Sequence, residues 1–121
     1  MSPMFTNLSI NLFTNLQNYS GSFNANIFNF KNVRNIEFIG GTINSSNLEV
    51  KGTVRVMKMS GVNDDDNNGC EISFSNTCNI EELYIDSCNL AKSTLTISNL
   101  NLLRKLVITN SNINSLILSD L

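Results

Sequence analysis

The sequence predicts an all-β protein, a parallel β-solenoid of about five coils with little helix. Three observations predict this fold. Asn and Ser together make up 37 of the 121 residues, and both side chains compete with a helical backbone for hydrogen bonds. Apolar residues occur in short bursts in which every second residue is apolar, as in β-strands. One kind of burst also returns at an interval of about 23 residues, as expected for stacked repeats.

Nine bursts follow one another along the chain, and each marks an expected strand. Each burst is a pair of apolar residues separated by one other residue. The pairs are Phe28/Phe30, Ile36/Phe38, Leu48/Val50, Met57/Met59, Ile72/Phe74, Leu83/Ile85, Leu95/Ile97, Leu106/Ile108 and Leu116/Leu118. The segments between them are too short for a helix on the convex side, so we expect two stacked parallel sheets.

Every second burst belongs to a longer frame of apolar positions. Its copies begin at Val33, Val54, Ile80 and Leu103, which are separated by 21, 26 and 23 residues. The segment 5–10 is interpreted as a degenerate first copy. A lone coil cannot bury its apolar face, so stacking of successive coils is expected to form the core.

The frame has a recognisable spacing. The copy at Ile80 reads IEELYIDSCNL and the copy at Leu103 reads LRKLVITNSNI. This spacing resembles the leucine-rich repeat, L-x-x-L-x-L-x-x-N/C-x-L, over residues 28–121. The position that is asparagine or cysteine in that family holds Gly41, Val62, Cys88 and Ser111 here. Of these four, the cysteine and the serine can hydrogen-bond the backbone of the turn.

The whole chain, 1–121, is expected to form a single solenoid domain. Residues 1–27 form an N-terminal cap or a degenerate coil: their apolar residues alternate as in a strand, yet Pro3 could also begin a helix. Residues 60–71 form a polar loop insertion, which accounts for the longest interval between copies of the frame.

The C-terminal coil is expected to expose an apolar layer. After Ile113, the residues Leu116, Leu118 and Leu121 make half of a further coil. An uncovered coil exposes both apolar side chains and a sheet edge. We therefore predict a homodimer in which two chains stack through this coil. The alternative is a half-coil that folds back as its own cap.

Polar residues between the apolar positions of the frame are expected to form rows across one sheet. One row is Arg34, Arg55, Glu81 and Arg104, and a second is Glu37, Lys58, Tyr84 and Val107. Arg and Tyr are enriched at recognition surfaces. The predicted protein-binding residues are Arg34, Glu37, Arg55, Lys58, Glu81, Tyr84, Arg104 and Lys105. The alternative is a solvated face with lateral charge pairs, such as Glu37 with Lys58.

The polar loop contains a partial calcium motif. Asp64, Asp66 and Asn68 stand at alternate positions before a glycine, as in the first half of a calcium loop. Position 12 is Ser75 instead of a bidentate glutamate, and the flanking segments resemble strands. We therefore expect an ordinary loop, no metal and no cofactor, and thermal melting that is the same with calcium or with a chelator.

Composition argues against several functional classes. The chain has no histidine, which excludes Ser/His/Asp and Cys/His catalysis. Glu82 and Asp86 share a strand face at roughly 13 Å, too far apart for a glycosidase pair, so no enzyme is expected. A net charge of −2 argues against direct nucleic-acid binding. Three cysteines without a CxxC pair and the absence of an apolar span favour an intracellular protein without membrane contact.

The leading functional hypothesis is a non-catalytic protein-binding scaffold that docks a protein partner on its charged sheet face. A second hypothesis is a small phage or mobile-element inhibitor of a nucleic-acid enzyme, in which Asp64–Asp66, Glu81 and Glu82 imitate phosphates. A third is a carbohydrate-binding β-helix, which rests on architecture alone.

Overall fold

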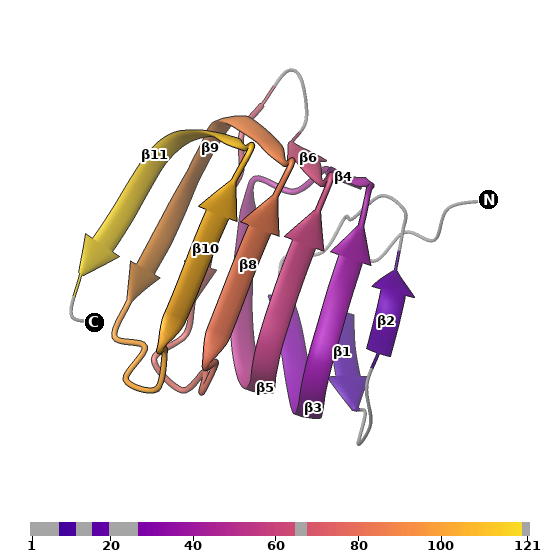
Figure 1. Cartoon of the computed structure of the whole chain (residues 1–121), viewed down its shortest axis with the longest axis vertical. Coiled ribbons are helices and arrows are strands. Elements are labelled where there is room, and N and C mark those ends of the chain that lie inside the picture. The colour runs from indigo at the N-terminus through magenta and orange to yellow at the C-terminus, as the bar shows by residue number, and fades with distance from the viewer. Residues whose placement is uncertain (1–7, 12–15, 20–26, 65–67, 120–121) are drawn as a thin grey trace.

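The structure is a computed structural model that describes residues 8–11, 16–19, 27–64 and 68–119. It is an all-β protein with 70% of its residues in strands and no helix among the residues described, and its parallel strands form a β-solenoid of about four turns (Figure 1). The predicted fold class is confirmed, with about four turns against the five coils expected.

The described residues form eleven strands of the solenoid. In chain order they are β1 (Leu8–Asn11), β2 (Leu16–Tyr19), β3 (Ile27–Ile39), β4 (Thr42–Ile43), β5 (Asn47–Ser60), β6 (Asn63–Asp64), β7 (Glu71–Phe74), β8 (Glu82–Asp86), β9 (Asn89–Ser98), β10 (Lys105–Thr109) and β11 (Asn112–Ser119). All pairings between them are parallel.

The strands lie on three sides of the solenoid. The front sheet contains β2, the second halves of β3 and β5, β8 and β10, which run side by side in Figure 1. The back sheet contains β1, the first halves of β3 and β5, β7, and the second halves of β9 and β11. A short corner sheet joins β4, β6 and the first residues of β9 and β11. The sequence predicted the two long sheets and missed the corner sheet.

The register of the front sheet follows the intervals in the sequence. Met57 pairs with Ile36 on one side and with Leu83 on the other, and Leu83 pairs with Leu106. These pairs reproduce the predicted spacings of 21, 26 and 23 residues. Each coil of the frame therefore stacks directly on the previous one.

The N-terminal strands correct one part of the sequence interpretation. Leu8 pairs with Phe28, which places β1 on the back sheet, so segment 5–10 is not a copy of the front-sheet frame. Leu16 pairs with Ile36 instead, and β2 therefore continues the front sheet. β1 and β2 thus add one strand to each long sheet. The rest of segment 1–27, for which a cap or a degenerate coil was expected, lies largely outside the described residues.

A left-handed residue follows the front strands of β3, β5, β8 and β10 and turns the chain into the corner sheet. These residues are Gly40 (φ 73°), Gly61 (φ 65°), Ser87 (φ 55°) and Asn110 (φ 50°). Glycine adopts such angles without strain, and asparagine tolerates them better than most residues. The amide of each of the first three donates to a carbonyl of the next coil, at 2.7 to 3.0 Å. The corners are therefore part of the hydrogen-bonded stack.

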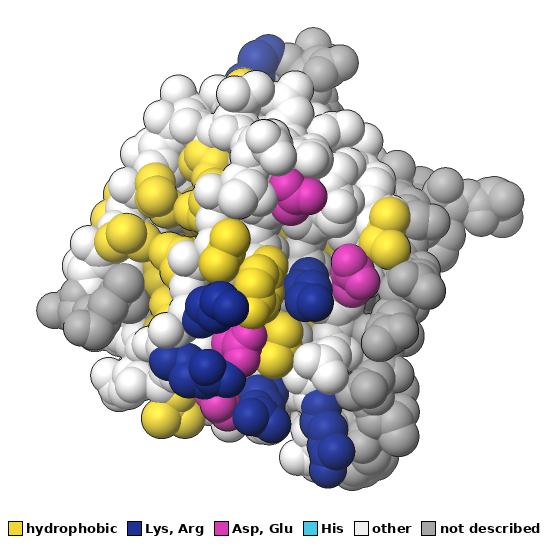
Figure 2. Space-filling view, in the orientation of Figure 1, with side chains coloured by type: hydrophobic (Ala, Val, Ile, Leu, Met, Phe, Trp, Pro, Cys, Tyr) yellow, Lys and Arg dark blue, Asp and Glu magenta, His cyan; other side chains and the backbone are white. Residues whose placement is uncertain are grey.

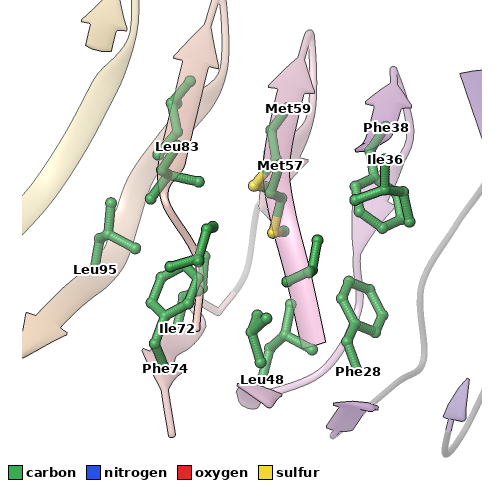
Figure 3. Close-up of a cluster of buried hydrophobic side chains, with 14 of the residues drawn as sticks. Phe28, Ile36, Phe38, Leu48, Met57, Met59, Ile72, Phe74, Leu83 and Leu95 are labelled. Carbon is green, nitrogen blue, oxygen red and sulfur yellow. The ribbon is translucent and has the colours of Figure 1, made fainter. Parts of the chain in front are cut away.

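The core is a column of apolar side chains between the sheets. Phe28, Leu48, Ile72 and Leu95 extend from the back of successive coils, and Ile36, Met57 and Leu83 extend from the front (Figure 3). All of these side chains are at most 2% exposed. The rings of Phe28 and Phe38 stack with centroids 5.2 Å apart. Burial of this column is the main favourable contribution to folding.

The predicted polar insertion at 60–71 is partly regular structure. It includes the end of β5 at Ser60 and the whole of β6, and the Asp64 side chain is buried at 6% exposure. Residues 65–67 lie outside the part of the chain that the structure describes.

Candidate functional site

The front sheet carries the predicted binding residues on its outer surface. Arg34, Arg55, Lys58, Arg104 and Lys105 are exposed, whereas Glu37, Glu81 and Tyr84 are half-buried among their neighbours. Basic and acidic side chains gather on this face, over β3, β5, β8 and β10 (Figure 2). We call this surface, formed by these eight residues together with Glu82 and Asp86, the front face.

The two predicted rows are confirmed by the register. Glu37 pairs with Lys58, Lys58 with Tyr84, and Tyr84 with Val107. In the other row, the Glu81 amide donates to the Arg55 carbonyl, and the Arg104 amide donates to the Glu81 carbonyl. Both rows therefore cross the front face from coil to coil.

Tyr84 lies at the centre of the front face, between two cations. The Lys58 Nζ lies 5.3 Å from the centroid of its ring and the Lys105 Nζ lies 5.5 Å from it. Each lysine belongs to a strand next to the strand of Tyr84, and both distances are within the range of a cation–π interaction. The Tyr84 hydroxyl donates a hydrogen bond to Glu82. The ring is thus held in one orientation.

Two glutamates form a network with two arginines. Glu81 forms ion pairs with the Arg55 Nε at 3.4 Å and with the Arg104 Nε at 3.6 Å, and Arg104 also pairs with Glu82. This is the lateral charge pairing that we expected as the alternative to a binding face. The particular pair suggested, Glu37 with Lys58, is not among the ion pairs of the described residues.

Electrostatics keep the Glu82 carboxylate charged. The hydrogen bond from Tyr84 is the largest influence and lowers the pKa of Glu82 below its ordinary value, with further lowering by the positive charges of Arg104, Lys105 and Arg55. A hydrogen bond to the charged form of an acid favours that form. Sequence reasoning considered Glu82 as a catalytic acid and as a phosphate mimic, and missed its role as the link between Tyr84 and Arg104.

A hollow lies beside the network, at the bend where the chain enters the front sheet. Its volume is about 400 Å³, and Arg34, Arg55, Thr53, Asn79 and Glu81 contribute to its lining. Arg34 is exposed and takes part in none of the four ion pairs found in the described part of the chain. The lining can offer a guanidinium group and amides to a negatively charged side chain.

The front face is more basic than the chain as a whole. It holds five of the eight basic side chains, namely Arg34, Arg55, Lys58, Arg104 and Lys105, but only four of the ten acidic ones, Glu37, Glu81, Glu82 and Asp86. The formal net charge of the chain is −2. The positive charge therefore concentrates on one side, which favours approach of an acidic surface.

Asp64, the first residue of the calcium candidate, has a structural role. Its Oδ2 accepts hydrogen bonds from the Lys92 amide and from the Ser93 hydroxyl, both at 2.8 Å. The Ser93 hydroxyl in turn accepts from the Cys70 amide at 3.0 Å. Asp66 lies outside the described residues, and Asn68 is exposed.

The described residues offer neither a cluster of metal ligands nor a membrane-spanning helix. In residues 8–11, 16–19, 27–64 and 68–119, no three His, Cys, Asp or Glu side chains gather closely enough to hold a metal ion. The same part of the chain contains no helix with the length and apolar character needed to span a bilayer.

The three cysteines, Cys70, Cys78 and Cys88, are buried, unpaired thiols. Burial, with smaller contributions from the charges of Asp64 and Glu71, raises the pKa of Cys70 to about 12. Burial also raises the pKa of Cys78 and of Cys88.

The Cys88 Sγ donates to the carbonyls of Asp86 and Met59. Ser111, one coil later, donates to the Thr109 carbonyl at 2.8 Å, so the predicted bonding of the turn backbone by these two residues is confirmed.

Comparison with protein-family models, with curated proteins and with solved structures finds no match to this chain.

Proposed function

We propose that the protein is a non-catalytic scaffold whose front face binds an acidic surface of a protein partner. The observation that carries the proposal is the arrangement around Tyr84, an aromatic ring held between Lys58 and Lys105 and hydrogen-bonded to Glu82. An aromatic side chain that is already ordered loses little conformational entropy on binding. Tyr and Arg are also the residue types that most often dominate binding energy.

The charges of the front face define the kind of partner. The excess of basic side chains attracts a negative surface, and the hollow beside Arg34 accommodates a carboxylate side chain of the partner. Because Glu81 and Glu82 are neutralised by Arg55 and Arg104, they support the phosphate-imitating inhibitor less well. Electrostatic attraction of this kind acts mainly on the rate of association and weakens as salt is added.

The test is capture of proteins from a lysate of the source cells on the immobilised chain, compared between variants. Arg55→Glu reverses a charge on the front face, and Tyr84→Ala removes the central ring. The control is Lys51→Glu, which makes the same charge reversal outside the front face. Lys51 lies in the back-sheet half of β5, where it pairs with Asn29 of β3. We expect one protein to be retained by the parent chain and by the control but lost from both front-face variants, with retention decreasing at high salt. Equal retention on all four chains would disprove the proposal.

A further inference from the structure

In the coil formed by β10 and β11, side chains at positions that are buried in the preceding coil are exposed to solvent. In the coil before it, Leu95 is 2% exposed and Ile97 is fully buried. Their register partners in β11 are Leu116 and Leu118, which are 43% and 47% exposed. Since these side chains occupy core positions, their exposure means that the described part of the chain places no further coil on them.

The same coil has open strand edges. Among the strands described, β10 pairs only with β8, and β11 pairs only with β9. Each therefore presents one row of backbone N–H and C=O groups without a neighbouring strand. Such edges add strands from other molecules unless something prevents it.

This coil carries few of the charges that normally protect an edge. Lys105, at the first position of β10, is the one charged residue of β10 and β11, and from Leu106 to Ser119 the sequence contains none. Proteins usually place lysine or another charged residue on exposed edge strands, because like charges repel an approaching copy. Two copies of this surface can therefore approach with little electrostatic repulsion, and each has apolar side chains to bury.

We propose that this surface binds the same surface of a second copy of the chain, with the two copies related by a two-fold axis perpendicular to the solenoid. Such an axis reverses the strand direction, so the open edges of β10 and β11 meet antiparallel edges of the partner. The described residues of each copy present such an apolar layer at this coil, and a two-fold contact covers both layers at once. Arg104 and Lys105 of the front face belong to this coil, whereas the other front-face residues lie on or beside β3, β5 and β8, away from the contact. The inference does not rest on the proposed function, and Leu118 lies on β11, outside the front face.

The first experiment is light scattering coupled to size exclusion at micromolar concentration. We expect twice the chain mass of 13.4 kDa for the parent chain and a monomer for Leu118→Lys. The control is Ile39→Lys, which makes the same replacement at a front-sheet residue that is 41% exposed and is expected to remain a dimer. A parent chain that stays monomeric, or a Leu118→Lys variant that stays dimeric with native circular dichroism, would overturn the proposal.

Hydrogen exchange at high and low protein concentration locates the contact. In the two-fold dimer, raising the concentration is expected to slow exchange in peptides covering residues 105–119 and to leave β1 and β2, residues 8–11 and 16–19 at the other end of the sheets, unchanged. Concentration-dependent protection at both ends of the solenoid would indicate head-to-tail stacking and would contradict the two-fold arrangement.

Discussion

Asp64 shows how single polar residues connect one coil to the next. It is the only buried side chain with a formal charge among the residues described, and it follows Asn63 in the corner sheet, in register with Ile43. Its carboxylate receives a backbone and a hydroxyl hydrogen bond from residues 92 and 93 of the next coil. A buried carboxylate is tolerated only when it is bonded in this way. In the sequence, the spacing of Asp64 from Asp66 and Asn68 made it a candidate calcium ligand. The sequence could not show that the Asp64 side chain points into the interior and is bonded there.

Replacement of Asp64 by alanine is expected to destabilise the fold by about 3 kcal/mol, because the Lys92 amide and the Ser93 hydroxyl lose their acceptor in the interior. Urea denaturation followed by circular dichroism measures the change. The control is Glu49→Ala, which removes a side chain that is 44% exposed, and a change within about 0.5 kcal/mol is expected. Equal stability of the two variants would show that the Asp64 bonds contribute nothing.

Removal of the Tyr84 hydroxyl by Tyr84→Phe is expected to raise the pKa of Glu82 toward its ordinary value of 4.5. Because folding lowers this pKa, the interaction stabilises the native state above pH 4.5 and is lost as the pH falls through the lowered value. The variant should therefore lose less stability on acidification than the parent chain. Titration of the glutamate carboxyl carbons by nuclear magnetic resonance gives the pKa directly. An unchanged value would mean that the hydroxyl does not hold the carboxylate.

At the scale of the strands, the sequence predicted the front sheet because its apolar positions repeat and each repeat must face the core. The spacings of 21, 26 and 23 residues are the sequence separations between strand residues that pair in the front sheet. The corner sheet was missed because strands of two residues, such as β4 and β6, are too short to show any alternation. The left-handed residues that follow the front strands could not be located individually, because glycine, serine and asparagine all occupy these positions and leave no repeated residue type. The pairing of Lys58 with Tyr84 follows from the strand register. The contact of the Lys58 Nζ with the ring also depends on the rotamers of both side chains, which the register does not determine.

The bend inside β5 depends on the small size of glycine. A Cβ at Gly52 would lie 2.0 Å from the Phe30 carbonyl oxygen, whereas a Cβ at Gly40 would meet no atom within 4 Å. Both residues have positive φ. We expect Gly40→Ala to cost about 1 kcal/mol, from the backbone angle alone, and Gly52→Ala to cost about 3 kcal/mol or more, since the coils must move apart. Thermal denaturation compares the two variants, and similar losses would contradict the close approach.

At the scale of the whole molecule, packing decreases toward the coil of β10 and β11. Leu83 and Ile85 are at most 1% exposed, whereas their register partners Leu106 and Ile108 are only partly buried. In a repeat protein each coil is stabilised mainly by its neighbours. A coil with one neighbour should therefore open before the others.

Equivalent leucines in neighbouring coils allow this gradient to be measured. In dilute solution, Leu95→Ala is expected to cost about 3 kcal/mol, as for a buried leucine. Leu116→Ala, at the position paired with it, should cost about 1 kcal/mol, because the side chain is already 43% exposed. Denaturant titrations of both variants provide the comparison. A larger loss for Leu116 than for Leu95 would reverse the gradient.

The parallel stacking also has a mechanical consequence. The backbone hydrogen bonds between coils run along the solenoid axis, and each strand is bonded only to the coil above and the coil below it. A pulling force along the axis would therefore load the bonds of one interface at a time and peel the coils apart in sequence. A force along the strands would instead shear many bonds together. The solenoid should thus be compliant along its axis and stiff across it.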